Sequence, residues 1–275
     1  MRGRDPDFLI IGAMKAGTTS LFRWLESVEG VELPQTKELN FFSGHTWDRG
    51  LEWYRSQFPS DAKATGEASP AYSSPSLAEV ASVRIHEIFP TIPLIFSVRD
   101  PVERARSHFR HQVQRGRERR PFPEAAGPDS HYVTGSLYTR AMSPYLRQFP
   151  AHQLLLVRFE QLTDDSEREW QRVLAFLELP DTPRPADIHN VTSQKRRYSR
   201  VLLRLWESGS LPRAESVPRV VRKLGKSAMT SDSARYRRLL TSSHMDLPEE
   251  SMRLIEQDQF ALREMTDLDP WRSTD

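Results

Sequence analysis

Hydrophobic residues in this chain follow two alternating patterns, short continuous apolar runs and longer segments with helical periodicity. The continuous runs at 8–11, 93–98 and 152–157 predict strands that are buried on both faces of a sheet. Between these runs, apolar residues recur every three or four positions, which predicts amphipathic helices. The predicted helices begin near 18 and 101 and cover 51–58, 76–89, 136–149, 166–177, 199–208, 216–225, 233–243 and 249–265.

The alternation of strands and helices indicates the fold class. It predicts an α/β fold with a mostly parallel central sheet flanked by helices, to which residues 64–72 add a short strand that runs into a loop. Because strands and helices alternate throughout the 275 residues, we expect a single domain over 1–275. In such folds the functional groups lie at the carboxyl ends of the strands.

A glycine turn joins the first predicted strand to the first predicted helix. It contains Gly12 and Gly17, and the helix begins near Thr18, so unpaired backbone N–H groups and the helix dipole favour a bound anion. The two glycines have the spacing of a P-loop, but Thr18 stands where the P-loop lysine should follow, and the loop's lysine is Lys15. The pattern therefore predicts an anion site, against the simpler alternative of a tight turn with a solvated lysine.

A second candidate anion site follows the second predicted strand. Asp100 is a good N-cap and Pro101 a good first helical residue, so a helix is expected to begin directly after Arg99. The guanidinium of Arg99 offers a planar fork of donors that suits a phosphate, and Ser107 adds a hydroxyl two turns later. The alternative is a capped helix with ordinary surface arginines. Two anion sites after two strands suit a ligand that carries phosphates at both ends.

Four segments of the chain resemble elements of sulfotransferases that use 3′-phosphoadenosine-5′-phosphosulfate, in particular the heparan-type branch. Residues 12–20 resemble the 5′-phosphosulfate loop, and the run from Arg99 to Ser107 resembles the 3′-phosphate element. Lys37-Glu38-Leu-Asn-Phe-Phe resembles the K-E-x-x-F-F element, and residues 66–72 resemble G-E-x-[ST]-P-x-Y. The resemblance implies a P-loop-like sulfotransferase fold.

The resemblance also implies roles for particular residues. Glu38 would be the catalytic base, and Lys15 would neutralise charge on the leaving bisphosphate. If Glu38 is not the base, His45 and His108 are the alternatives by motif position. The 3′-phosphate would be held by Arg99 and Ser107, and the 5′-phosphate contacts would come from Lys15, Ala16, Gly17, Thr18, Thr19 and Ser20.

Several polar positions have more than one interpretation. Heparan-type members carry a second active-site lysine where this chain has Ala68, so we do not transfer their mechanism whole. The neighbouring Glu67 either orients Lys15 or is a structural carboxylate. The basic run 110–120, followed by a loop predicted to reach Gly135, is either a solvated face or a rim that attracts an acidic acceptor. In the loop 190–200, candidate donor contacts are Lys195, Arg196 and Arg197.

Composition narrows the class of protein. Hydrophobic residues make up 37% and charged residues 28%, as in a globular protein, and the net charge of +2 gives no argument for nucleic acid. The chain has no cysteine, which excludes disulfides and thiolate metal sites, and no Asp-rich or His-rich cluster predicts a metal. The apolar opening at 8–14 is far shorter than the roughly 18 residues of a membrane span and leads directly into the glycine turn. We therefore expect a cytoplasmic protein without a membrane partner.

The resemblance implies transfer of a sulfuryl group from 3′-phosphoadenosine-5′-phosphosulfate to a hydroxyl or amine, with adenosine 3′,5′-bisphosphate as the other product, and the two predicted anion sites agree with such a donor. The acceptor would be a small molecule or a carbohydrate, and the sequence leaves its identity and the oligomeric state open. The first alternative is a P-loop nucleotide kinase or triphosphatase, which Thr18 disfavours. The second is a non-catalytic nucleotide-binding protein.

Overall fold

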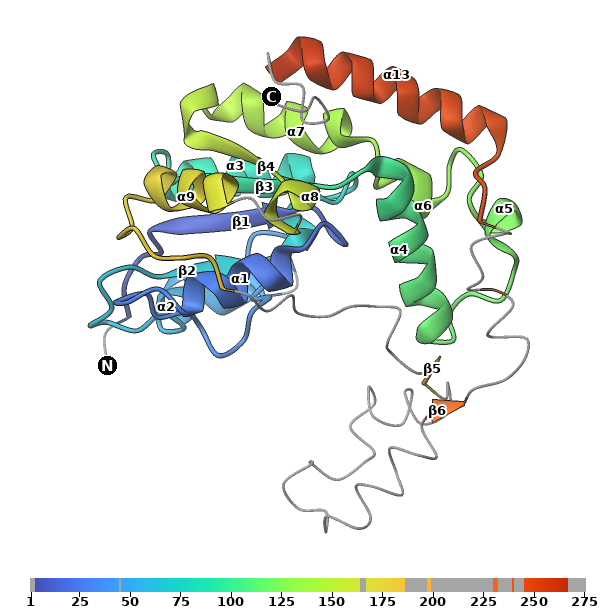
Figure 1. Ribbon diagram of the computed structural model, residues 1–275. Coiled ribbons are helices and arrows are strands. Elements are labelled where there is room, and N and C mark those ends of the chain that lie inside the picture. The colour runs from blue at the N-terminus through green and yellow to red at the C-terminus, as the bar shows by residue number, and fades with distance from the viewer. Residues whose placement is uncertain are drawn as a thin grey trace.

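The protein has a parallel four-stranded sheet with helices on both faces (Figure 1). The computed structural model describes residues 3–44, 46–163, 167–185 and 245–266, together with residue 239 and the backbone of 197–198 and 230–231. The strands are β1 (Phe8–Gly12), β2 (Gly66–Ala68), β3 (Leu94–Val98) and β4 (Leu154–Arg158), in the order β2-β1-β3-β4, and β5 (Arg197–Tyr198) pairs with β6 (Thr230–Ser231). The predicted α/β fold is confirmed, and the short strand predicted within 64–72 is the edge strand β2.

The described helices follow most of the predicted ones. They are α1 (Thr18–Glu26), α2 (Gly50–Arg55), α3 (Ala78–Ile88), α4 (Pro101–Gln114), α5 (Phe122–Ala125), α6 (His131–Thr134), α7 (Tyr138–Gln148), α8 (Phe159–Thr163), α9 (Glu167–Phe176) and α13 (Glu249–Thr266). Short 3₁₀ turns lie at η1 (Trp47–Arg49), η2 (Pro70–Ser73) and η3 (Ala151–Gln153). The segment before Gly135, predicted as a loop, instead contains α5 and α6. The predicted helices at 199–208, 216–225 and 233–243 lie outside the described residues apart from position 239.

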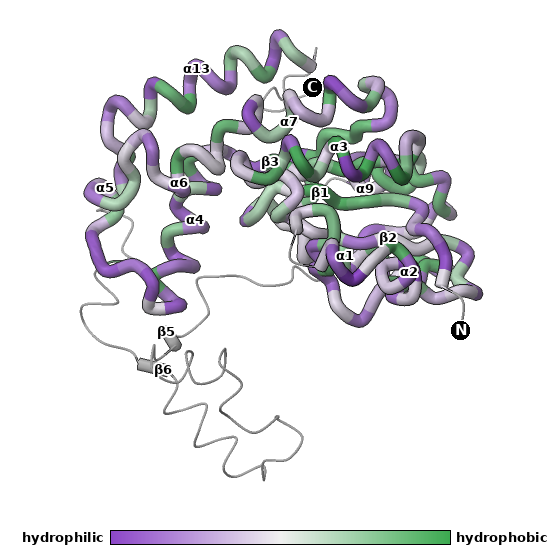
Figure 2. Tube along the Cα trace, turned by 180° about the vertical axis from the view of Figure 1, so that it is seen from behind, coloured by the Kyte–Doolittle hydropathy of each residue, from purple (hydrophilic) through white to green (hydrophobic). Residues whose placement is uncertain are grey.

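Alternate residues of the central strands enter two different cores. Leu9 and Ile11 of β1 belong to a cluster with residues of α3, α7 and α13, whereas Phe8 and Ile10 belong to a cluster with residues of α1 and α9. The sheet is therefore covered on both faces, which explains why its strands are continuous apolar runs (Figure 2). None of the described helices is long and apolar enough to cross a membrane.

A third core determines which way α4 faces. Ala105, Phe109 and Val113 of α4 pack against α5 and α6 and against Ile255 of α13. Because these residues recur every four positions, they turn one side of the helix inward and leave the side with Arg104, Ser107 and His108 for another surface.

A buried carboxylate holds the segment that contains Glu38. Glu67 has no exposed surface, and its Oε1 accepts hydrogen bonds from the hydroxyls of Tyr54 (2.9 Å) and Tyr72 (2.6 Å). Its Oε2 accepts from the hydroxyl of Ser69 (2.7 Å) and the backbone N–H of Leu39 (3.3 Å). Burial raises the pKa of Glu67, and these hydrogen bonds act in the opposite direction. The hydrogen-bond pattern makes Glu67 a structural carboxylate.

We expect Glu67→Gln to destabilise the protein by about 1–3 kcal/mol, the usual penalty for leaving buried polar groups unpaired. Each carboxylate oxygen of Glu67 accepts hydrogen bonds from two donors. In either orientation of the glutamine amide, its NH₂ group would therefore face two donors and leave them without an acceptor. Urea unfolding measures the effect, with Glu29→Gln at an exposed position as the control. Equal midpoints for the two variants would contradict the role assigned to Glu67.

Candidate active site

One cavity of about 1090 Å³ lies at the carboxyl ends of the four strands. Each strand contributes the residues that follow it: 13–15 and 17–20 after β1, 70–71 and 73–77 after β2, Arg99 after β3 and Phe159 after β4. The predicted site residues that line this cavity are Lys15, Gly17, Thr18, Thr19, Ser20, Glu38, Arg99, Ser107 and His108. Two segments predicted separately as anion sites thus face the same space.

The remaining predicted residues lie elsewhere. Ala16, a residue of the glycine turn, is fully buried and does not line the cavity. Its N–H donates to the carbonyl of Ala13 (3.1 Å). His45, Lys195 and Arg196 lie outside the described residues. The backbone of Arg197 lies in β5, and the structure does not describe its side chain.

The glycine turn has a conformation that needs its glycines. Gly17 is the N-cap of α1 with φ of 82°, and an added Cβ would lie 2.2 Å from the ring of Phe159. An added Cβ at Gly12 would lie 1.8 Å from Oγ of Ser73. No side chain caps α1, so the N–H groups of Thr18 and Thr19 at its start can donate to an anion. The anion site stays a prediction, and the conformation of the loop agrees with it.

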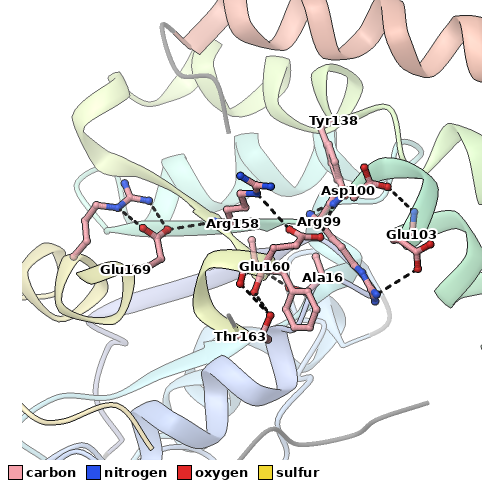
Figure 3. Close-up of polar contacts among 12 residues, drawn as sticks. Ala16, Arg99, Asp100, Glu103, Tyr138, Arg158, Glu160, Thr163 and Glu169 are labelled. Carbon is pink, nitrogen blue, oxygen red and sulfur yellow. Dashed lines mark hydrogen bonds and ion pairs between the residues drawn. The ribbon is translucent and has the colours of Figure 1, made fainter. Parts of the chain in front are cut away.

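Arg99 is positioned by its backbone and by an aromatic ring (Figure 3). The hydroxyl of Tyr138 accepts from the N–H of Arg99 (3.1 Å) and donates to its carbonyl (2.7 Å). The guanidinium carbon lies 5.0 Å from the ring centroid of Phe159, and Nη2 lies 3.7 Å from Oε2 of Glu103. Nε of Arg99 is buried without a hydrogen-bond partner. The Arg99 side chain thus lines the cavity, and its Nε–H group could donate a hydrogen bond to a ligand.

The helix after Arg99 begins as predicted. Oδ1 of Asp100 accepts a hydrogen bond from the N–H of Glu103 (2.8 Å), which confirms Asp100 as the N-cap, and Pro101 is the first helical residue. The N–H of Asp100 donates to Oε1 of Glu160 (2.9 Å) in α8. These contacts fix the start of α4 and hence the direction in which Ser107 points.

A buried arginine that sequence reasoning left without a role connects the loop to α4. Arg104 is 2% exposed, and it donates to Oγ of Ser136 (2.8 Å) and to the carbonyls of Met14 (3.2 Å) and Tyr132 (3.1 Å). Burial lowers the pKa of Arg104 to about 10, so it remains charged near neutral pH. In the sequence, Arg104 lies inside the run from Arg99 to Ser107 that resembles the 3′-phosphate element, and this was the signal that could have placed it at the site.

His108 is a poor proton acceptor in this environment. It is 3% exposed, and its Nε2 lies 3.2 Å from Nε2 of Gln112. Burial and then the neighbouring charge of Arg104 lower the pKa of His108 to about 2, so its imidazole is neutral at physiological pH. A group with so low a pKa binds a proton weakly, and this favours Glu38 over His108 as the base.

Glu38 lies at the rim of the cavity beside the glycine loop. Its side chain is 52% exposed, and Nζ of Lys37 lies 3.1 Å from its Oε1. The same Nζ lies 3.4 Å from Oγ1 of Thr18, the first residue of α1. A solvent-accessible carboxylate thus faces the space next to the predicted anion loop.

The fold and the cavity define an α/β protein with a glycine loop and a second cationic element around one ligand space. Residues 5–208 match the sulfotransferase domain family, and the chain belongs to that family. Human (Homo sapiens) heparan sulfate glucosamine 3-O-sulfotransferase 5 is 31% identical over 191 residues, which cover 64% of this chain and 54% of the relative. The bifunctional heparan sulfate N-deacetylase/N-sulfotransferase 1 of Caenorhabditis elegans is 27% identical over 277 residues, which cover 90% of this chain and 32% of the relative.

A solved structure shares the fold. The sulfotransferase from Alicyclobacillus acidocaldarius superposes with a TM-score of 0.66 at 22% identity, covering 98% of this chain and 99% of that one. The chain spans about half the length of the human relative. These comparisons confirm the predicted family and do not favour the kinase or triphosphatase alternative. Within the described ranges, no group of three or more His, Cys, Asp or Glu side chains is arranged to hold a metal ion.

Arg99→Ala is expected to weaken binding of adenosine 3′,5′-bisphosphate by about 2 kcal/mol or more, roughly thirty-fold in Kd, because a charge-assisted contact is lost. Arg99→Lys should recover only part of the affinity, since an ammonium cannot present the planar fork. Isothermal titration calorimetry measures both, with Arg147→Ala on the outer surface of α7 as the control. Unchanged affinity in Arg99→Ala would remove this residue from the donor site.

Proposed function

We propose that this protein transfers a sulfuryl group from 3′-phosphoadenosine-5′-phosphosulfate to a hydroxyl or amine of a carbohydrate or small-molecule acceptor. The observation that carries the proposal is the single cavity that joins the glycine loop, Arg99 with Ser107, and the carboxylate of Glu38. Two anion-binding elements suit a donor with phosphates at both ends of an adenosine, and the carboxylate suits removal of a proton. Membership of the sulfotransferase family supports the same reaction.

The residues present fit this donor. The uncapped N-terminus of α1 and the hydroxyls of Thr18, Thr19 and Ser20 would hold the 5′-phosphate. The free Nε of Arg99 and the hydroxyl of Ser107 would hold the 3′-phosphate at the start of α4. Phe159 contacts the Arg99 guanidinium and lies against Gly17, so a single ring lies between the two phosphate positions.

The chemistry divides between two side chains. The donor supplies a sulfuryl group whose bond to the bridging oxygen breaks as a bond from sulfur to the acceptor oxygen or nitrogen forms. Glu38 accepts the acceptor's proton at a carboxylate oxygen, and Lys15 in the glycine loop stabilises the negative charge that develops on the leaving oxygen.

The cavity walls support an acidic carbohydrate as acceptor. The wall after β2 is uncharged and rich in serines, with Ser73, Ser74 and Ser76, which suits sugar hydroxyls. The opposite wall on α4 continues beyond Ser107 to Arg115, eight residues or about 12 Å further along the helix. In the basic run 110–120, Arg110, His111 and Arg115 line the cavity, which supports the interpretation as a rim for an acidic acceptor over that of a wholly solvated face. The relatives named above act on heparan sulfate, which agrees with such an acceptor.

Glu38→Gln should lower turnover by about 10²- to 10⁴-fold, because glutamine keeps the shape but does not accept a proton at neutral pH. Affinity for adenosine 3′,5′-bisphosphate and the melting temperature should change little, since the donor's proposed anchors are Lys15, the loop amides and Arg99. Steady-state sulfation rates measure the effect, with the exposed Glu79→Gln as the control. Near-normal turnover would remove Glu38 as the base, and a joint loss of turnover, affinity and stability would make it a scaffold residue.

Arg115→Gln should raise KM about tenfold for an oligosaccharide that contains uronic acid, because one charge-assisted contact worth about 1.5 kcal/mol is lost. The carboxyl-reduced form of the same oligosaccharide should show no such change. Arg119→Gln is the matched control, since Arg119 lies four residues further along the same basic run and is exposed outside the cavity. Equal KM changes for the acidic and reduced acceptors would contradict an anion contact at Arg115.

A further inference from the structure

The segment around Glu38 is fixed to the edge strand through the backbone on both sides of it. The carbonyl of Lys37 accepts a hydrogen bond from the N–H of Ala68 (3.4 Å), and the N–H of Leu39 donates to Glu67 (3.3 Å). The backbone of Lys37 and Glu38 is therefore held in place at the edge of β2, although the two side chains differ in exposure. Lys37 is 16% exposed and Glu38 is 52% exposed, so the ammonium lies beneath the carboxylate.

The ammonium of Lys37 contacts two parts of the candidate site at once. Its Nζ lies 3.1 Å from Oε1 of Glu38 and 3.4 Å from Oγ1 of Thr18. Thr18 is 3% exposed, begins α1 and lines the cavity together with Glu38, whereas Lys37 is not part of the cavity lining. One partly buried ammonium group thus contacts both the carboxylate and the glycine loop, and it does not line the cavity itself.

The charges around Lys37 determine the strength of this contact. Burial lowers the pKa of Lys37, whereas Glu38 raises it; Arg23 lowers it and Glu67 raises it. A carboxylate–ammonium contact that is partly withdrawn from water is screened less than a surface pair. The contact therefore holds the Glu38 carboxylate beside Thr18 more firmly than a fully exposed ion pair would.

We propose that Lys37 is a positioning residue for the sulfuryl-transfer reaction: by contacting both Glu38 and Thr18, it holds the Glu38 carboxylate beside the glycine loop. This inference rests on the proposed function, and it assigns Lys37 a task separate from that of Lys15, which faces the ligand space. Lys37 acts through Glu38, so its loss should affect turnover more than donor affinity.

The test compares Lys37→Met, which keeps chain length without charge, with Lys37→Arg, which keeps the charge. Lys37→Met should lower kcat about tenfold or more, because the Glu38 carboxylate loses the contact that holds it beside the glycine loop. Lys37→Arg should restore most of the rate, since it keeps a charged donor for Glu38 and Thr18. Affinity for adenosine 3′,5′-bisphosphate should stay within about twofold in both. Lys63→Met, at an exposed lysine outside the cavity, is the control.

A second readout does not depend on turnover. Crystal structures should show the Glu38 side chain beside Thr18 in the wild type and in Lys37→Arg, and displaced from it in Lys37→Met. Wild-type protein that makes no sulfated product would overturn the proposed function, whereas the crystal structures still test the Lys37–Glu38 link. Unchanged kcat and an unchanged Glu38 position in Lys37→Met would overturn the inference, as would a loss of rate and stability that Lys37→Arg does not reverse.

Discussion

The candidate site depends on the parallel pairing of β1 with β3. The register aligns Leu9 with Leu94 and Ile10 with Ile95, so both strands end at the same edge of the sheet. The N–H of Ala13 then donates to the carbonyl of Ser97 (2.7 Å), which fixes the glycine loop to the end of β3 just before Arg99. Because parallel strands place their carboxyl ends together, two segments more than eighty residues apart in sequence form one cavity.

Two buried charged groups stabilise opposite sides of this cavity. Glu67 accepts four hydrogen bonds beneath the Glu38 segment, and Arg104 donates to carbonyls of the glycine loop and of the residues before α7. Burying a charge is costly unless its hydrogen bonds are satisfied, and both groups have several partners. Their hydrogen-bond networks hold the segments that carry Glu38 and the glycine loop in defined positions. The rigidity of the site therefore depends on these two buried groups.

The sequence predicted the elements that depend on local patterns. Apolar runs identified β1, β3 and β4, and the Asp100-Pro101 pair identified the start of α4 within a residue. Hydrophobic periodicity could not show which polar face of α4 lines the cavity. A basic helical face has the same sequence pattern whether it contacts solvent or a ligand. Ala16 was grouped with its loop neighbours by motif, but in the fold its side chain points into the core. The role of Glu67 depended on Tyr54 and Tyr72, whose proximity arises only from the tertiary fold.

The proposed reaction of this cavity is sulfuryl transfer. Mass spectrometry tests it on acidic and neutral saccharides and on simple alcohols and amines, each incubated with the protein and 3′-phosphoadenosine-5′-phosphosulfate without added metal. We expect at least one acceptor to gain the mass of one sulfuryl group, with an equal amount of adenosine 3′,5′-bisphosphate released. No mass gain across the panel, together with phosphate release or transfer from ATP and Mg²⁺, would contradict it.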